Sequence, residues 1–256
     1  MNNLLRAETY KLKRNKTFWV LLITMIGLSS FLHYLIVSDW WFMSGTPFDQ
    51  AGLSELNALS VFMTPLYFNF VVSTLAGYYI SVEFSQTRVI KNQIISGNKR
   101  SHIFMSKYIL FSLAAYIVTV FIPVLTALLM VLFIKDGTVI TSKSLTYLFS
   151  SYGIFTIGFF CFTALVFIIA ILTEDSGKTI LFTFLISVVM FIIDLLATKP
   201  WIQAFYEHTF YFHFKAAFQH RLATGEIWTL IVIGFGSLLL MLLLGMYMFN
   251  KKEIKS

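Results

Sequence analysis

Residues 148–172 read LFSSYGIFTIGFFCFTALVFIIAIL, a run of 25 residues without a charged side chain. A helix needs about 20 consecutive, mostly apolar residues to cross the hydrocarbon core of a bilayer. Five more runs of this kind occur along the chain of 256 residues. The six predicted spans are residues 18–37, 61–82, 108–134, 148–172, 179–197 and 227–249. The sequence therefore predicts an all-α, polytopic membrane protein, in which residues 1–256 form a single transmembrane domain.

The composition excludes most soluble classes of protein. Charged residues make up 12% of the chain, hydrophobic residues 58% and aromatic residues 18%. An ordinary soluble domain is about 25% charged, so this chain has too few charges to cover a soluble surface. Disorder is excluded as well, because disordered segments combine low hydrophobicity with high net charge.

The distribution of Lys and Arg predicts the orientation of the spans. The two tails and the loops after the second and fourth spans together carry 14 Lys and Arg, whereas the opposite loops carry five. Positively charged loops tend to stay in the cytoplasm, so we expect both termini there, in a bacterial plasma membrane. The cations flank the spans, where they suit anionic lipid headgroups, and they form no continuous stripe for nucleic acid. Membrane lipid is therefore an expected partner and nucleic acid is not.

The predicted spans contain almost no ionisable side chains. Asp194 is the only acid well inside a span, near the outer end of the fifth, and His33 lies near the outer end of the first. Ion-coupled carriers usually need such groups near mid-bilayer. The chain has no GxxxxGK[ST] or HExxH motif, and its single Cys161 excludes an intrachain disulfide. We therefore expect no catalytic residue, no metal site, and an energy source on another chain.

The longest predicted cytoplasmic loop, residues 83–107, contains a short amphipathic helix. Its apolar side chains include Val89, Ile90 and Ile94, and the Gly97-Asn98 pair predicts where the helix ends. A short helix between two long spans can dock into a groove of a partner protein. It can equally serve as a basic interfacial helix that holds the topology. The residues alone leave both interpretations open.

The order of motifs in this loop matches a known pattern. A glutamate ends the second span, a Thr-Arg pair and an apolar pair follow, and after a basic turn Lys107 opens the third span. This order resembles the permease subunit of type 2 ABC transporters, the six-span class that includes bacitracin- and lantibiotic-resistance exporters. Gln86 departs from the family pattern, in which glycine is common. The resemblance implies a coupling helix that binds an ABC ATPase through Glu83, Thr87, Arg88, Ile94, Ile95, Gly97, Asn98, Lys99 and Arg100.

Both ends of the chain agree with the resemblance. Leu4, Leu5, Glu8 and Leu12 recur at helical spacing beside several cations. This pattern is typical of an interfacial helix on the inner leaflet, and it is similar to the N-terminal elbow helix of the family. The basic tail at residues 249–253 is similar to the ending that follows the sixth span in the family.

The second predicted span has a stripe of small and polar residues at every fourth position. Small residues at this spacing let helices approach closely within lipid. The stripe therefore predicts a helix–helix contact or, alternatively, a face that lines a translocation route. Its members are Pro65, Asn69, Ser73, Gly77 and Ser81.

The predicted outer loop at residues 198–226 is unusually aromatic. It is too apolar for a free loop and too interrupted to span the membrane, so an interfacial or re-entrant helical pair fits best. The resemblance implies an outer gate at Trp201, Phe205, Phe210 and Phe212, and an aromatic belt at the headgroups is the alternative. His208, His213 and His220 share the loop, but their spacing does not place them on one helical face, so no metal site is expected.

The resemblance implies the membrane subunit of an ATP-driven exporter. Two ABC ATPases with ATP and Mg²⁺, and a second copy or a related permease, would complete the machine, and this chain would carry no cofactor. Closure of the ATPases would drive alternating access for an amphipathic peptide antibiotic, toxin-like peptide or lipid-like molecule. A channel or ion-coupled carrier is the alternative. An intramembrane enzyme is a further one, with Glu207 and His208 as its only candidate catalytic pair.

Overall fold

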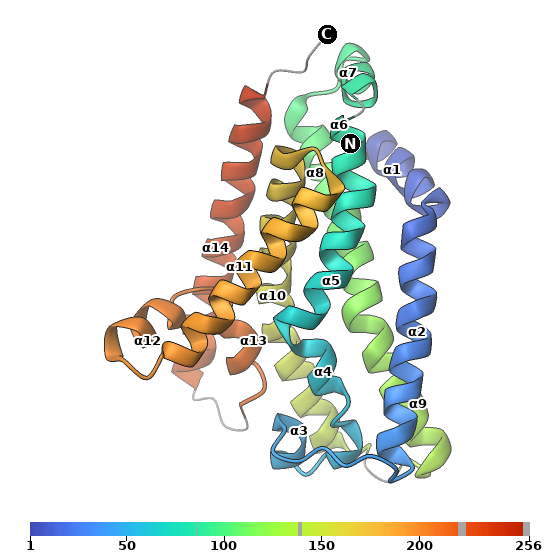
Figure 1. Cartoon of the computed structure of the whole chain (residues 1–256), viewed down its shortest axis with the longest axis vertical. Coiled ribbons are helices and arrows are strands. Elements are labelled where there is room, and N and C mark those ends of the chain that lie inside the picture. Colours follow the sequence, from blue (N-terminus) through green and yellow to red (C-terminus); the bar gives the residue numbers. More distant parts are fainter. Residues whose placement is uncertain (86, 138–139, 220–223, 253–256) are drawn as a thin grey trace.

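The structure, a computed structural model, describes residues 1–85, 87–137, 140–219 and 224–252, and every regular element in these ranges is helical. The prediction of an all-α protein is therefore confirmed (Figure 1). The elements are α1 (Asn2–Arg14), α2 (Lys16–Val37), α3 (Pro47–Gln50), η1 (Ser54–Leu56), α4 (Leu59–Met63), α5 (Pro65–Leu75), η2 (Ala76–Ser81), α6 (Val82–Ser85), α7 (Thr87–Ile95), α8 (Arg100–Tyr116), η3 (Ile117–Phe121), α9 (Ile122–Ile134), α10 (Ser142–Thr173), α11 (Ser176–Leu196), α12 (Pro200–Glu207), α13 (Phe212–Ala216) and α14 (Thr224–Lys251).

Five helices among the described residues are long and apolar enough to cross a membrane. They correspond to the first, third, fourth, fifth and sixth predicted spans, and they confirm a polytopic membrane protein. Two of them extend several residues beyond the predicted apolar segments at their N-terminal ends. The five are Lys16–Val37, Arg100–Ile134, Ser142–Thr173, Ser176–Leu196 and Thr224–Lys251.

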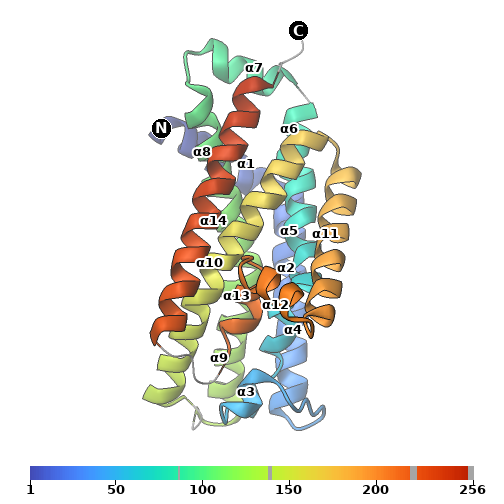
Figure 2. The same cartoon turned by 90° about the vertical axis from the view of Figure 1, so that its left-hand side faces the viewer.

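The second predicted span is a column of shorter helices. Thr64 is extended, with ψ of 124°, and Pro65 follows as the first residue of α5. Proline has no N–H to donate, so the chain breaks here between α4 and α5. Beyond α5 the column continues without interruption through η2 and α6, and η2 is a π-helix. The column packs against α11 and runs along the bundle, although a count of six spans stays a prediction (Figure 2).

The two ends of the bundle differ in what they carry. α1, α7 and the C-terminal end of α14 lie at one end, called here the elbow end (Figure 1). α3 and α4 lie toward the other, called here the far end. The chain turns between α1 and α2 at Asn15, whose side chain accepts a hydrogen bond from the N–H of Phe18 at 3.0 Å. This cap lets α2 start in a new direction.

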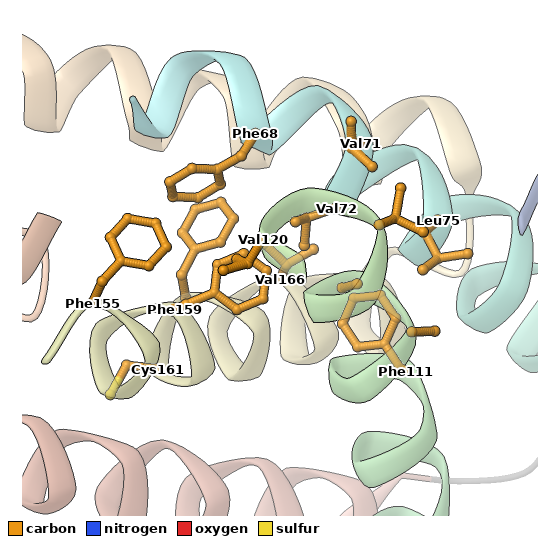
Figure 3. Close-up of a cluster of buried hydrophobic side chains, with 14 of the residues drawn as sticks. Phe68, Val71, Val72, Leu75, Phe111, Val120, Phe155, Phe159, Cys161 and Val166 are labelled. Carbon is orange, nitrogen blue, oxygen red and sulfur yellow. The ribbon is translucent and has the colours of Figure 1, made fainter. Parts of the chain in front are cut away.

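α10 is the central helix of the bundle. In its apolar window 72% of the residues are buried, against 11% in α14, so the peripheral helices leave most of their apolar surface to lipid. Phe155 and Phe159 of α10 point toward Phe68 of α5 (Figure 3). The ring centroids of Phe68 and Phe155 lie 6.0 Å apart in an edge-to-face arrangement, a favourable geometry for aromatic pairs. Cys161 is buried on the same helix with a free thiol.

The short helix α13 fits into a space that two glycines leave open. The ring of His213 lies between α10 and α14 and donates a hydrogen bond from Nε2 to the carbonyl of Leu230 at 2.7 Å. A Cβ at Gly158 of α10 would lie 2.7 Å from the Cβ of His213. A Cβ at Gly234 of α14 would lie 2.9 Å from His213 Nε2 and would collide with Ile157. Close approach at these two positions therefore requires glycine.

Replacing Gly234 by alanine will destabilise the protein. The added methyl group collides with Ile157 and His213, and overpacking of this kind costs about 1–3 kcal/mol. Thermal unfolding of the purified protein in one detergent measures the change. Gly236→Ala is the matched control, because no atom lies within 4 Å of a Cβ there on the same helix. Equal melting temperatures for the two variants would contradict the packing described here.

Candidate functional site

The helix α7 has the end that its sequence predicts. Gly97 has a φ of +82°, a left-handed conformation that glycine adopts without strain. The N–H of Asn98 donates to the carbonyl of Gln93 and the N–H of Gly97 donates to that of Ile94. This pair of bonds is a Schellman motif. The predicted C-terminal cap at Gly97-Asn98 is therefore confirmed, and the geometry turns the chain sharply from α7 into α8.

The two faces of α7 have different environments. Ile90 faces the protein and is 2% exposed, whereas Ile95 is 72% exposed. Lys91 and Asn92 are also exposed, as are Gly97 and Lys99 after the helix. Gln86 lies outside the described residues, and so do the side chains of Thr87 and Arg88, whose backbone is part of α7. The helix thus has an anchored face and a free face at the elbow end.

The anchored side of α7 adjoins four charged residues that form the ionic cluster: Glu8 and Lys11 of α1, Glu83 of α6 and Lys107 of α8. The Nζ of Lys107 lies 2.9 Å from Oε1 of Glu8 and also contacts Oε2 of Glu83. Lys11 lies 3.0 Å from Oε1 of Glu8 and 2.9 Å from Oε1 of Glu83. Each cation therefore contacts both acids.

Neutral side chains extend the ionic cluster to two further elements. The hydroxyl of Tyr79 in η2 donates to Oε2 of Glu8 at 3.0 Å. The amide of Gln93 in α7 donates to Oε1 of Glu8 at 3.2 Å. Glu8 and Lys107 are completely buried. Because buried charges are stable only when paired, these contacts fix α1, η2, α6, α7 and α8 relative to one another.

Pairing decides the charge state of the two residues on α1. Burial by itself would raise the pKa of Glu8, but the charges of Lys107 and Lys11, and hydrogen bonds from both, hold it below the ordinary value of 4.5. Burial would likewise lower the pKa of Lys11, but the charges of Glu83 and Glu8 raise it above the ordinary value. Both groups are therefore charged at neutral pH.

Arg100, predicted to bind a partner, contacts the end of α14. Its Nη1 donates to the carbonyls of Asn250 at 2.7 Å and Lys252 at 3.0 Å. Cations suit the carbonyl end of a helix, which carries partial negative charge. Lys252 in turn lies 2.6 Å from a carboxylate oxygen of Glu174, after α10. The start of α8 thereby joins the elbow ends of α10 and α14. A partner contact of Arg100 stays a prediction.

A family model described as ABC-2 family transporter protein matches residues 4–193, which include α7 and the whole ionic cluster. The chain belongs to the ABC-2 transporter family. It is therefore a permease, the transport subunit of an ABC transporter. No curated protein matches the chain. The narrower likeness to bacitracin- and lantibiotic-resistance exporters stays a prediction.

The small-residue stripe of the permease packs against α11. Asn69 donates to the hydroxyl of Ser187 at 3.1 Å, and the hydroxyls of Ser81 and Thr179 lie 2.8 Å apart. The Cα of Gly77 is so close to α11 that a Cβ would lie 3.1 Å from backbone atoms of Ser176. The contact that the stripe predicts is therefore present, and the alternative of a translocation route stays a prediction.

The aromatic residues of the predicted outer gate divide into two groups. Trp201 and Phe205 of α12 are 72% and 58% exposed, whereas Phe210 is 7% exposed. Phe212 is half-buried, and its ring lies 5.9 Å from that of Tyr206. The segment is a pair of short helices that packs onto α10 and α11. His220 lies outside the described residues, and no cluster of metal-ligating side chains is found within the described ranges.

The sequence did not predict the ionic cluster as a unit. Glu83, Lys107 and the neutral partner Gln93 belong to the predicted loop, but Lys11 and the neutral partner Tyr79 carry no signal of their own. Glu8 offered one, because it shares a helical face with Leu4 and Leu12, which are buried with it. A second signal that could have been used is in α11, where a hydroxyl side chain recurs at every fourth position. These residues are the buried face of the helix, and they are Thr179, Thr183 and Ser187.

Replacing Lys107 by methionine will strongly destabilise the permease. It leaves Glu8 buried with one cation instead of two, and removal of one partner from a buried pair costs about 3–5 kcal/mol. Thermal unfolding in detergent measures the loss. Lys143→Met, an exposed lysine at the start of α10, is the control and should change little. The double variant Glu8→Gln/Lys107→Met should lose less than the sum of the single losses. Strict additivity would show that the two residues are not coupled.

The ionic cluster will also make stability depend on pH. Because the pKa of Glu8 is lowered on folding, its contribution is present above about pH 4.5 and disappears as the pH falls through the lowered pKa. The difference in melting temperature between the natural protein and Glu8→Gln should be constant from pH 7 to pH 5 and shrink below. Glu55→Gln, at the far end, is the comparison. A difference that grows on acidification would contradict the assignment.

Proposed function

We propose that this permease is the membrane subunit of an ATP-driven exporter and that a separate ABC ATPase binds the free face of α7. The observation that carries the proposal is the combination of an exposed Ile95 with an anchored side tied to Glu8 through Gln93. A helix that is exposed on one face and bonded to the bundle on the other can pass a displacement by a bound partner on to the bundle. The family membership supports an ABC ATPase as the partner.

The partner-binding residues of the proposal fall into two groups. The first group would contact the ATPase and lies at the two ends of α7. It consists of Thr87 and Arg88 at the start of the helix and of Ile94, Ile95, Gly97, Asn98 and Lys99 at its end. Glu83 and Arg100 bond within the chain, so they would act by holding α7 and α8 in place. The two groups differ because the polar groups of Glu83 and Arg100 already have hydrogen-bonding partners within the chain, as buried polar groups usually do.

The complete machine would contain two ATPases, ATP and Mg²⁺ on those chains, and a second copy of this chain or a related permease. The elbow end would face the cytoplasm of a bacterial plasma membrane, with both termini there and residues 1–256 acting as one permease domain. The concentration of Lys and Arg in the segments of the elbow end supports this orientation.

Transport would follow from coupled movement of α7. Closure of the two ATPases would displace α7, and the ionic cluster would pass that displacement to α1, α6 and α8 together. A helix contact that has two alternative arrangements can convert a small shift into a change in the side of the membrane from which the route is open. The α5–α11 contact is the candidate for such a two-state contact. The outer gate would be formed by Trp201, Phe205, Phe210 and Phe212. The apolar and aromatic interior suits an amphipathic cargo, namely a peptide antibiotic, a toxin-like peptide or a lipid-like molecule.

A pull-down with the ABC ATPase co-expressed with the permease tests the docking surface. Ile95→Asp should weaken retention of the ATPase about tenfold, the effect of losing roughly 1.4 kcal/mol at an interface. Phe42→Asp is the matched control, since Phe42 is equally exposed at 78% but follows α2 at the far end. Full retention of the ATPase by Ile95→Asp, with unchanged ATP hydrolysis, would refute docking through α7.

A further inference from the structure

A cavity of about 340 Å³ opens at the far end of the protein, between the α4–α5 break and the helices α11 to α13. This volume is within the range of small-molecule sites. Its walls are mainly apolar and come from six helices, α3, α4, α5, α11, α12 and α13, and from residues that adjoin them. They include Met63, Leu66, Met190, Phe191, Phe214 and Phe218.

The polar groups of the cavity wall include those at the break between α4 and α5. The hydroxyl of Ser60 lines it and is buried without a hydrogen-bond partner in the described structure. Thr64 and Pro65 also line it, so the interrupted backbone between α4 and α5 faces the cavity. Irregular backbone at membrane depth is tolerated where it lines a cavity, and interrupted helices often mark the binding sites of membrane transporters.

One ion pair completes the lining. The Nζ of Lys215 lies 2.9 Å from Oδ1 of Asp194, and their side chains are 59% and 25% exposed. One charge comes from α13 and the other from α11, so the pair presents a positive and a negative site side by side. Because the pair is partly hydrated, its mutual attraction is weak. A ligand that supplies both opposite charges can therefore replace it at little cost.

We propose that the cavity binds one zwitterionic phospholipid of the far-end leaflet. The lipid phosphate would pair with Lys215 and its ammonium group with Asp194, while the first part of an acyl chain lies between Met63 and Phe214. Ser60 would donate its hydrogen bond to an ester oxygen. An anionic lipid fits less well, because it offers no cation to Asp194. The proposal is independent of the proposed transport cycle, since the binding requires no ATPase.

Native mass spectrometry of the purified permease tests this site. The protein is incubated with phosphatidylethanolamine or phosphatidylglycerol of identical acyl chains, and retained lipid is counted. We expect about tenfold greater retention of phosphatidylethanolamine by the natural protein. Asp194→Asn/Lys215→Gln should abolish that preference. Asp39→Asn/Lys135→Gln is the control, because it removes another ion pair of the far end, at 2.8 Å.

A second variant tests the apolar part of the cavity. Leu66→Trp places an indole among the lining side chains and should exclude both lipids, while the melting temperature in detergent checks that the protein is folded. The pair of Asp194 and Lys215 is partly exposed, and both substitutions keep the side chains close to their natural size, so that variant remains informative if Leu66→Trp unfolds. Equal retention of the two lipids by the natural protein, or an unchanged preference in the neutralised variant, would overturn the proposal. The proposal would also be overturned if an amphipathic peptide antibiotic displaced the bound phosphatidylethanolamine while added phospholipid did not.

Discussion

A buried charge needs a partner, and this requirement organises the elbow end of the protein. Glu8 and Lys107 lie far apart in sequence and are both removed from solvent. Neither could be buried alone, because desolvating a single charge costs more than most side chains recover by packing. The N-terminal helix α1 is therefore held against α6 and α8 by ionic contacts. α7 is joined to that unit through Gln93, and the surface proposed for the ATPase depends on it.

Within the bundle, the helices are held together by close packing of their backbones and not by the hydrophobic effect that drives soluble proteins to fold. Lipid is as apolar as leucine, so helices in a membrane gain most where small residues allow tight contact and hydroxyls find partners. The contact of α5 and η2 with α11 has both features, with Gly77 of η2 against Ser176 and Asn69 of α5 bonded to Ser187. The glycines around His213 serve the same purpose for α13. Each contact leaves the outer faces of the helices free for lipid.

The sequence predicted the features that depend on local pattern. Five of the spans follow from long apolar runs, and the end of α7 follows from Gly97, because only local backbone geometry is involved. The ionic cluster could not be predicted in full, since it joins residues 8, 11, 83 and 107 through the fold. Proline at position 65 also fits the regular small-residue stripe, so the sequence predicted one continuous span where the structure has a break. The cavity at the far end has no sequence signal, since its lining comes from segments far apart in the chain.

Both helical columns that carry Glu83 and Lys107 contain a π-helical segment, η2 and η3. A π-helix contains more residues per turn than an α-helix. If such a segment rewinds into α-helix, every residue after it turns by about 100° for each residue that is taken up. Glu83 follows η2 by two positions, so rewinding there would rotate its carboxylate away from both lysines. A change in the winding of η2 would therefore alter the contacts of Glu83 in the ionic cluster at the elbow end.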